Sequence, residues 1–161
     1  MTEVFSFLDP LQELREFQAS WIPRLAGVDV LGDREFALSN LAPHHDRWIE
    51  ERFPEVSTRH HAEQIHANQI AVVTEISDQT TIQYSGVDGL VTNLTNQLLA
   101  IYVADCAAIY LADPVTRSIG LLHSGKKGTE GNILREGVMQ MQKNYGTRPS
   151  DLVCVVSPCI R

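Results

Sequence analysis

The spacing of hydrophobic residues changes character along the chain. Over residues 11–25 apolar side chains recur at close to the 3.6-residue period of an amphipathic helix, at Leu11, Leu14, Phe17, Trp21 and Leu25. Asp9 as cap and Pro10 in the first helical position supply a start for this helix. A second helix is predicted over residues 45–53, ended by Pro54.

The middle of the chain consists of short runs rich in Val, Ile, Leu and Tyr, which predict strands. Turn residues such as Ser77-Asp78, Asp88-Gly89 and Asp113-Pro114 separate them. The predicted strands cover residues 70–76, 81–84, 98–104, 107–111, 118–122 and 152–156.

A last helix is predicted over residues 129–144, with Gly146 as its stop. Helices and strands follow one another without regular βα alternation. This order predicts the α+β class (a mixed α/β sheet flanked by helices) rather than a doubly wound fold. With 161 residues, no repeat and no linker, the chain is expected to form a single domain, residues 1–161.

Composition excludes some partners. Thirteen basic and twenty acidic residues give a net charge of −7, which argues against nucleic acid and against an anionic membrane surface as partners. The longest apolar run, residues 98–104, is cut by Asp105 and is too short to span a bilayer. The first residues, Met1 to Phe5, show no basic signal-peptide start, and three cysteines without a finger pattern suit free thiols in the cytoplasm.

Three segments carry residues suited to chemistry, each at the predicted end or break of a strand. They are 64–68 with His66, 104–106 with Cys106, and 123–129 with His123. His66, Cys106 and His123 together form a His2Cys donor set of the kind that zinc accepts with a fourth position left open. Their separations fit no local metal motif, so on spacing alone a core cysteine and two ordinary polar histidines are the stronger interpretation.

A metal-free alternative uses two of the same residues. Cys106 as thiolate nucleophile and His123 as its base would make a cysteine hydrolase or amidase. Asp105 adjoins Cys106 but would point to the opposite face of a continuing strand, which favours a structural role for it.

The turn that follows His123 suits an anion. Lys126, Lys127 and Gly128 lead into the last helix, where unpaired N–H groups and the helix dipole favour negative charge. A solvated basic turn capped by Thr129 is the alternative. The pairs His44-His45 and His60-His61 are expected at the surface, and Cys154 in the core; Cys159 is left without a role.

Taken in order, several motifs resemble the YfiH family, the laccase-domain group named for multicopper polyphenol oxidases and regarded as purine nucleoside phosphorylases. The resemblance covers residues 36–161 and rests on Gln64-Ile65-His66, the run from Val87 to Asn93, Ala104-Asp105-Cys106, Ala112-Asp113-Pro114, Ile119-Gly120, His123-Ser124-Gly125 and Lys127-Gly128-Thr129.

The resemblance implies zinc, with copper as an alternative metal, held by His66, Cys106 and His123. It implies a small-molecule nucleoside and phosphate as partners: phosphorolysis of adenosine, inosine, guanosine or methylthioadenosine, and deamination of adenosine. The resemblance also includes two other roles proposed for the family, polyphenol oxidation and the editing of peptidoglycan precursors. The oligomeric state is left open.

The chain departs from the family pattern at several points. Ala67 replaces a glycine, and Lys126 and Lys127 stand where the family has Trp and Arg, so the bidentate fork of an arginine is absent. The sequence also stops at Arg161, before a further C-terminal stretch of the family. A shortened, inactive relative is therefore a third hypothesis beside the phosphorylase and the metal-free amidase.

Overall fold

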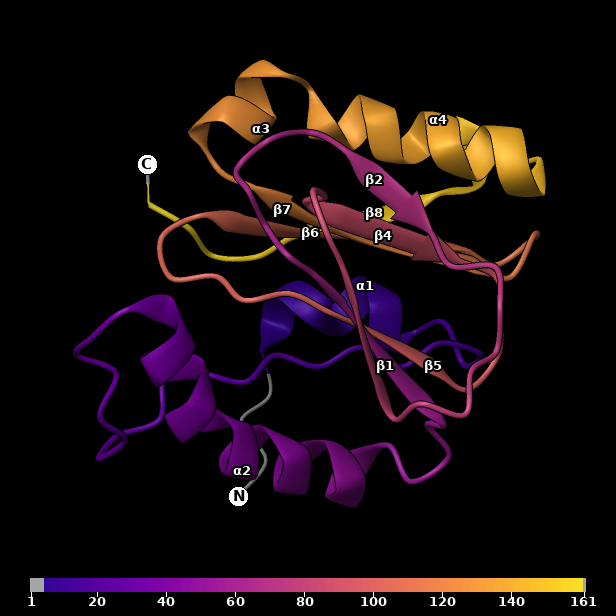
Figure 1. Ribbon diagram of the computed structural model, residues 1–161. Helices are drawn as coiled ribbons and strands as arrows, with labels where there is room; N and C mark the ends of the chain where they lie inside the picture. Colours follow the sequence, from indigo (N-terminus) through magenta and orange to yellow (C-terminus); the bar gives the residue numbers. More distant parts are fainter. Residues whose placement is uncertain (1–4, 161) are drawn as a thin grey trace. The chain divides into compact units, whose positions relative to one another are not determined.

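A computed structural model describes residues 5–160 of the chain (Figure 1). Residues 1–4 and Arg161 lie outside the described part, and the expectation about a signal peptide falls mostly on them. The chain divides into two compact units, residues 5–19 with 57–160 and residues 20–56. Among the described residues, no helix has the length and apolar character needed to cross a bilayer.

The larger unit is built on a mixed five-stranded sheet with the order β2-β4-β7-β6-β8. Its strands are β2 (Ile70–Val72), β4 (Gly89–Thr92), β6 (Ala107–Asp113), β7 (Ser118–Ser124) and β8 (Val153–Val156). The β2 and β4 strands run parallel, whereas β4, β7, β6 and β8 pair antiparallel. Together with the helices, this sheet confirms the predicted α+β class.

A second sheet in the same unit has three strands, all parallel, in the order β3-β1-β5. They are β1 (Thr58–Ala62), β3 (Thr81–Tyr84) and β5 (Gln97–Ala100). The helix α4 (Ile133–Tyr145) covers one face of the five-stranded sheet, and β1 and β5 lie across the other face (Figure 1).

Strand β7 shows how two cores share one sheet. Successive side chains of a strand point to opposite faces, so Leu122 packs toward Met141 of α4 while Leu121 packs toward Leu99 of β5. Both faces of the sheet are therefore buried. This explains why β4 is buried along its whole length and why its sequence shows no polar alternation.

The first helix is much shorter than predicted over residues 11–25. A 3-10 turn η1 (Ser6–Leu8) leads into α1 (Asp9–Gln12), and the remainder has no helix. Pro23 lies inside the predicted range and has no N–H for a helical hydrogen bond, which is incompatible with a helix continuing through that position. Asp9 is the first helical residue rather than the cap, which is Leu8.

The smaller unit, residues 20–56, contains α2 (Arg34–Arg52), which begins well before the predicted residue 45. Asp33 caps this helix by accepting a hydrogen bond from the Phe36 N–H at 2.9 Å. Near its end, the Arg52 guanidinium lies 3.5 Å from the centre of the Trp48 ring.

The predicted helix over residues 129–144 is two helices, α3 (Lys126–Glu130) and α4. Asn132 separates them in a left-handed conformation, and its side chain accepts from the Arg135 N–H at 3.3 Å to start α4. Thr129 therefore lies inside α3 and caps no helix. Gly146, also left-handed, ends α4 as predicted.

The strand over residues 81–84 is confirmed, and the others differ in length. The predicted strands over 70–76 and 98–104 end earlier, at Val72 and Ala100, while those starting at 107 and 118 continue to Asp113 and Ser124. Two strands were not predicted, β1 and β4. A last 3-10 turn, η2 (Pro149–Asp151), precedes β8.

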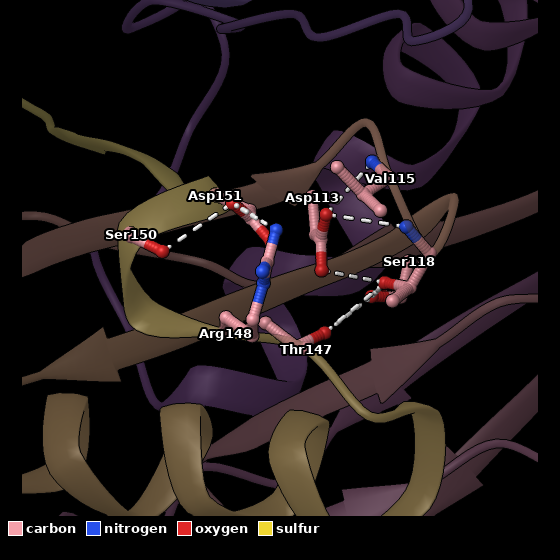
Figure 2. Close-up of polar contacts among 8 residues, drawn as sticks. Asp113, Val115, Ser118, Thr147, Arg148, Ser150 and Asp151 are labelled. Atoms are coloured by element: carbon pink, nitrogen blue, oxygen red, sulfur yellow. Dashed lines mark hydrogen bonds and ion pairs between the residues drawn. The ribbon is translucent and has the colours of Figure 1, made fainter.

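The turn between β6 and β7 is fastened by a buried carboxylate (Figure 2). Asp113 accepts from the Val115 N–H at 2.8 Å, the Thr116 N–H at 3.2 Å and the Thr116 hydroxyl at 2.7 Å. Burial alone would raise the pKa of Asp113, but the hydrogen bonds from Thr116, Thr147 and Val115 outweigh it and lower the pKa below its ordinary value.

This turn makes a prediction about acid stability. Because the pKa of Asp113 is lower in the folded chain, its charge stabilises the fold above the unfolded-state pKa of about 4, and this contribution is lost as the pH falls below that value. We expect Asp113→Asn to lower the free energy of unfolding by about 1–3 kcal/mol at neutral pH. In urea titrations, the difference from the wild type should shrink below about pH 4. The exposed Asp78→Asn is the matched control; a difference independent of pH would contradict this role for Asp113.

Candidate metal centre

The structure brings His66, Cys106 and His123 together. The Cys106 sulfur and one ring nitrogen of each histidine lie within 4.8 Å of one another. His66 lies in the turn between β1 and β2, Cys106 directly before β6, and His123 near the end of β7. The imidazole rings meet edge to face, with their centres 4.8 Å apart and their planes at 86°.

Strand register places two of these side chains. In the antiparallel pair of β6 and β7, Ala108 lies opposite His123 and Ala107 opposite Ser124. Cys106 therefore enters the sheet beside the end of the strand that carries His123. The hydrophobic pattern of the two strands fixes this register, since a slip of one residue would turn His123 from the Leu121 face to the Leu122 face.

The buried carboxylate of Asp88 lies behind His123. Asp88 Oδ1 accepts from the His123 ring Nδ1–H at 2.8 Å, and both residues are almost fully buried, with 0% and 3% of their surface exposed. This hydrogen bond fixes the tautomer, since an ionised carboxylate only accepts. The Nε2 lone pair of His123 is thereby left for a metal or a proton, the arrangement commonly found behind metal-binding histidines.

The same carboxylate holds the turn that carries His66. It accepts from three consecutive backbone N–H groups, those of Ile65 at 3.2 Å, His66 at 2.8 Å and Ala67 at 2.8 Å. Such a row of converging amides forms a nest for an anion. One buried charge therefore positions both histidines of the set.

Backbone conformation makes the nest. Gln64 and His66 have left-handed φ values of 65° and 62°, which side-chain-bearing residues adopt at a cost of about 1–3 kcal/mol each. Turning the chain at these two positions points the intervening amides in one direction. The hydrogen bonds to Asp88 offset that strain.

The Gln64 side chain ties this turn to the segment that leads to Cys106. Its amide nitrogen donates to the Tyr102 carbonyl at 2.6 Å, and its amide oxygen accepts from the Tyr102 N–H at 2.8 Å. The Gln64 side chain is 6% exposed, and its amide group pairs with the backbone of Tyr102 as a residue of a neighbouring strand would. It connects the turn of His66 to the chain four residues before Cys106.

Gly125 lies against all three candidate ligands. A methyl group at this position would be 3.0 Å from the Cys106 sulfur, 3.3 Å from His66 Cδ2 and 3.7 Å from His123 Cε1. The missing side chain leaves room beside the donor atoms. Gly128 serves packing in the same way, since a methyl group there would lie 2.9 Å from the Ala67 carbonyl oxygen.

The donor set fits a borderline metal ion such as Zn²⁺. Two imidazoles and one thiol within 4.8 Å match the ligand types and number of catalytic zinc sites, which leave a fourth position to water or substrate. Exposure rises from the buried His123 through the half-buried Cys106 to the exposed His66, so solvent reaches one side of the set.

Other predicted residues lie as follows. Lys126 and Lys127 are exposed at the start of α3, directly after Gly125, whereas Gly128 is buried. Asp105 is exposed in a bend, because the chain leaves β5 before it and enters β6 after it.

Two expectations about burial are wrong. His60 is fully buried rather than at the surface, with its ring nitrogens 3.1 Å from the Tyr84 hydroxyl and 2.8 Å from Gln97 Oε1. Cys154 is exposed rather than in the core, because its position on β8 falls on an uncovered side of the edge strand.

The role of Asp88 is not predicted from the sequence, in which Asp88-Gly89 is expected to form part of a turn. A signal was present: Asp88 is an acid between the apolar residues Val87 and Leu90, at the entrance of a run that proves to be a central strand. A charged side chain at the entrance of a buried strand needs partners.

Comparison with known proteins identifies related sequences. Residues 39–161 match the family model of the multi-copper polyphenol oxidoreductase laccase. Purine nucleoside phosphorylase YlmD of Bacillus subtilis is 31% identical over 138 residues, covering 83% of this chain and 46% of the relative. A purine nucleoside phosphorylase of Deinococcus radiodurans is 42% identical over 93 residues, covering 58% of this chain and 36% of the relative.

Solved structures are also similar to this chain. YlmD from Geobacillus stearothermophilus superposes with a TM-score of 0.65 at 33% identity, covering 83% of this chain and 50% of that one. The Bacillus licheniformis hypothetical protein YfiH gives a TM-score of 0.62 at 28% identity, covering 83% and 51%. The chain therefore belongs to the laccase-domain family of YlmD and YfiH, which confirms the resemblance. It spans about half the length of the YlmD relatives.

The role of Asp88 can be tested by removing its charge. We expect Asp88→Asn to weaken metal binding about 10–100-fold, because His123 loses the acceptor that fixes its tautomer and the His66 turn loses its anion. The affinity would be measured by competition with a chromophoric chelator, with circular dichroism to confirm folding. Asp105→Asn, exposed and next to Cys106, should bind metal like the wild type. Unchanged affinity in a folded Asp88→Asn variant would show that Asp88 acts on the fold alone.

Proposed function

We propose that the chain is a zinc-dependent purine nucleoside phosphorylase that also deaminates adenosine. The observation that carries the proposal is the convergence of His66, Cys106 and His123 on one point, with Asp88 behind them, in a chain whose relatives are named purine nucleoside phosphorylases. Adenosine, inosine, guanosine and methylthioadenosine are the proposed nucleosides, with inorganic phosphate as co-substrate. Copper is the alternative metal, in keeping with the name of the family model.

In phosphorolysis, a phosphate oxygen attacks the anomeric carbon of the sugar while the bond to the purine nitrogen breaks and the base leaves. Zinc, when bound, would supply a Lewis acid and, for deamination, a water ionised near neutral pH. The protein must hold the anion near the sugar and stabilise the charge that develops on the leaving base.

The chain's own residues divide this work. Lys126 and Lys127, both exposed directly after Gly125, are proposed to bind the phosphate. Gly128 lets α3 pack against the carbonyl of Ala67 and so keeps the two lysines beside the His66 turn. Asp88 holds the His123 proton on Nδ1, away from the site.

A reducing compartment is proposed for this enzyme, and we place it in the cytoplasm. All three cysteines are free thiols in the structure, and Cys106 must stay reduced to serve as a metal ligand.

One observation favours a second candidate, a metal-free cysteine hydrolase of the amidase type acting on peptidoglycan precursors. Cys106, His123 and Asp88 lie in the order of a nucleophile, a base and the carboxylate that orients the base. In this arrangement Asp88 fills the place for which Asp105 was a poor candidate. His66 has no part in such a triad, and for this reason we prefer the metal site.

Replacing Cys106 tests the metal site and the activity together. Cys106→Ala removes the thiolate donor, so we expect loss of bound zinc and of nucleoside turnover, while Cys154→Ala, on the exposed edge strand, retains both. Metal content would be measured on purified protein. Adenine, inosine and hypoxanthine would be separated by chromatography after incubation of adenosine with and without phosphate.

The products separate the hypotheses. Adenine that appears only with phosphate indicates phosphorolysis, and inosine formed without phosphate indicates deamination. Full zinc occupancy in Cys106→Ala would refute the ligand assignment. A thiol-dependent amidase activity that survives complete metal removal would favour the second candidate, and a zinc-loaded chain without any turnover would indicate an inactive relative.

The lysines make a separate prediction about phosphate. Lys126→Gln and Lys127→Gln should each raise the KM for phosphate about tenfold, since a hydrogen bond to a charged group contributes about 1.5 kcal/mol at the low end of its range, which suits an exposed site. Lys143→Gln, exposed in the last turn of α4, is the matched control. Initial rates against phosphate concentration would show the effect. Unchanged KM in both variants would remove the lysines from the phosphate site.

A further inference from the structure

The pairing of β8 with β6 continues past the end of the strand. Within the strands, Val156 faces Ile109 and Val155 faces Tyr110 in an antiparallel register. Beyond them, the Ser157 N–H donates to the Ala108 carbonyl at 2.9 Å, and the Ser157 hydroxyl accepts from the Ala108 N–H at 2.9 Å. The Ile160 N–H then donates to the Asp105 carbonyl at 3.1 Å.

These hydrogen bonds bracket two cysteines. The Ile160–Asp105 hydrogen bond comes three residues after the Ser157–Ala108 one, whereas a regular antiparallel ladder repeats every two residues, so the segments stay adjacent beyond Val156 without continuing the ladder. Cys159 and Cys106 are the chain neighbours of the two residues that the second hydrogen bond joins. Where two antiparallel segments are joined by such a hydrogen bond, the residues beside it, one on each segment, have Cα atoms about 4.5–5.5 Å apart. This spacing lies inside the range of about 4.4–6.8 Å that a disulfide requires.

We propose that Cys106 and Cys159 form a reversible disulfide under hydroperoxide oxidation. Cys159 is exposed and Cys106 half-buried, so an oxidant reaches the pair from solvent. The third thiol, Cys154, lies five residues before Cys159, inside β8 and opposite Leu111, and takes no part.

The chemistry balances with hydrogen peroxide as the oxidant. The thiolate of one cysteine attacks the peroxide, the O–O bond breaks, and a sulfenic acid and water are formed. The second thiolate then attacks the sulfenic sulfur, the S–O bond breaks, and the disulfide and a second water result. A dithiol reductant reverses the reaction by thiol–disulfide exchange.

The disulfide would occupy the sulfur that the metal site needs. Formation of the disulfide itself is independent of the proposed function; only its consequence, the loss of metal binding, rests on it. Bound metal should in turn protect Cys106 from peroxide, since one sulfur cannot serve both bonds.

The experiment treats the full chain with hydrogen peroxide after metal removal. We expect the thiols titrated in denaturant to fall from three to one, with a monomeric mass that has lost two hydrogen atoms. Tryptic peptides 60–117 and 144–161 should appear as one cross-linked species that separates on reduction. Cys154→Ser should behave in the same way, whereas Cys159→Ser should form no cross-link.

Metal uptake provides the second readout. Oxidised wild type should fail to take up Zn²⁺ and recover fully after reduction, whereas oxidised Cys159→Ser should recover only in part, because Cys106 then proceeds to irreversible sulfinic acid. A cross-link that persists in Cys159→Ser, one that joins two copies of the chain, or three thiols remaining after treatment would each overturn the proposal. If the cross-link forms but reduced protein binds no metal, the metal site fails while the disulfide stands.

Discussion

The buried carboxylate of Asp88 is the interaction on which the site and its surroundings depend. A charge taken out of water costs several kcal/mol unless the protein supplies its own donors. Here the donors are one imidazole and three consecutive amides, so the His66 turn and the end of β7 must meet at the entrance of β4. The backbone of the same residue donates to the Gln69 carbonyl and accepts from the His123 N–H at 2.7 Å, which joins β2 and β7 to β4 at this point. The hydrogen bonds that satisfy this carboxylate therefore also bring the two histidines together.

Regular and irregular segments contribute differently to the site. His123 is held by the register of two long strands, while His66 lies on a turn of unusual backbone conformation that persists only because Asp88 and Gln64 hold it. Cys106 lies between these extremes, in a bend at the entrance to β6. A metal site needs its ligand atoms held to within about 0.5 Å of their positions. In this chain the sheet positions His123, and hydrogen bonds to the backbone position the turn that carries His66.

The sequence was informative wherever side-chain chemistry and burial agree. The run over 81–84 alternates as a half-buried strand should, and its predicted bounds match β3; Gly146 marks the end of α4 for a local conformational reason. Strand β1 was missed because its inward positions are Thr58 and His60, whose hydrogen bonds to Ser77, Tyr84 and Gln97 are visible only in three dimensions. The three donors were found by residue type and by family resemblance, whereas Asp88 acts through backbone amides and leaves no spacing pattern along the chain.

The position of Cys106 beside the five-stranded sheet explains why its thiol has two proposed reactions, metal binding and disulfide formation. Strand β6 has β7 on one side and β8 on the other, so the residue at its entrance meets the end of β7 with His123 and the continuation of β8 with Cys159. The imidazole of His123 favours a metal ion shared with Cys106, and the thiol of Cys159 favours oxidation of the pair to a disulfide. The first neighbour is set by strand register, which the hydrophobic core fixes far from the site, and the second by the hydrogen bond between Ile160 and Asp105. The balance between a metal-loaded and an oxidised centre would therefore depend on metal and oxidant concentrations, with no rearrangement of the sheet.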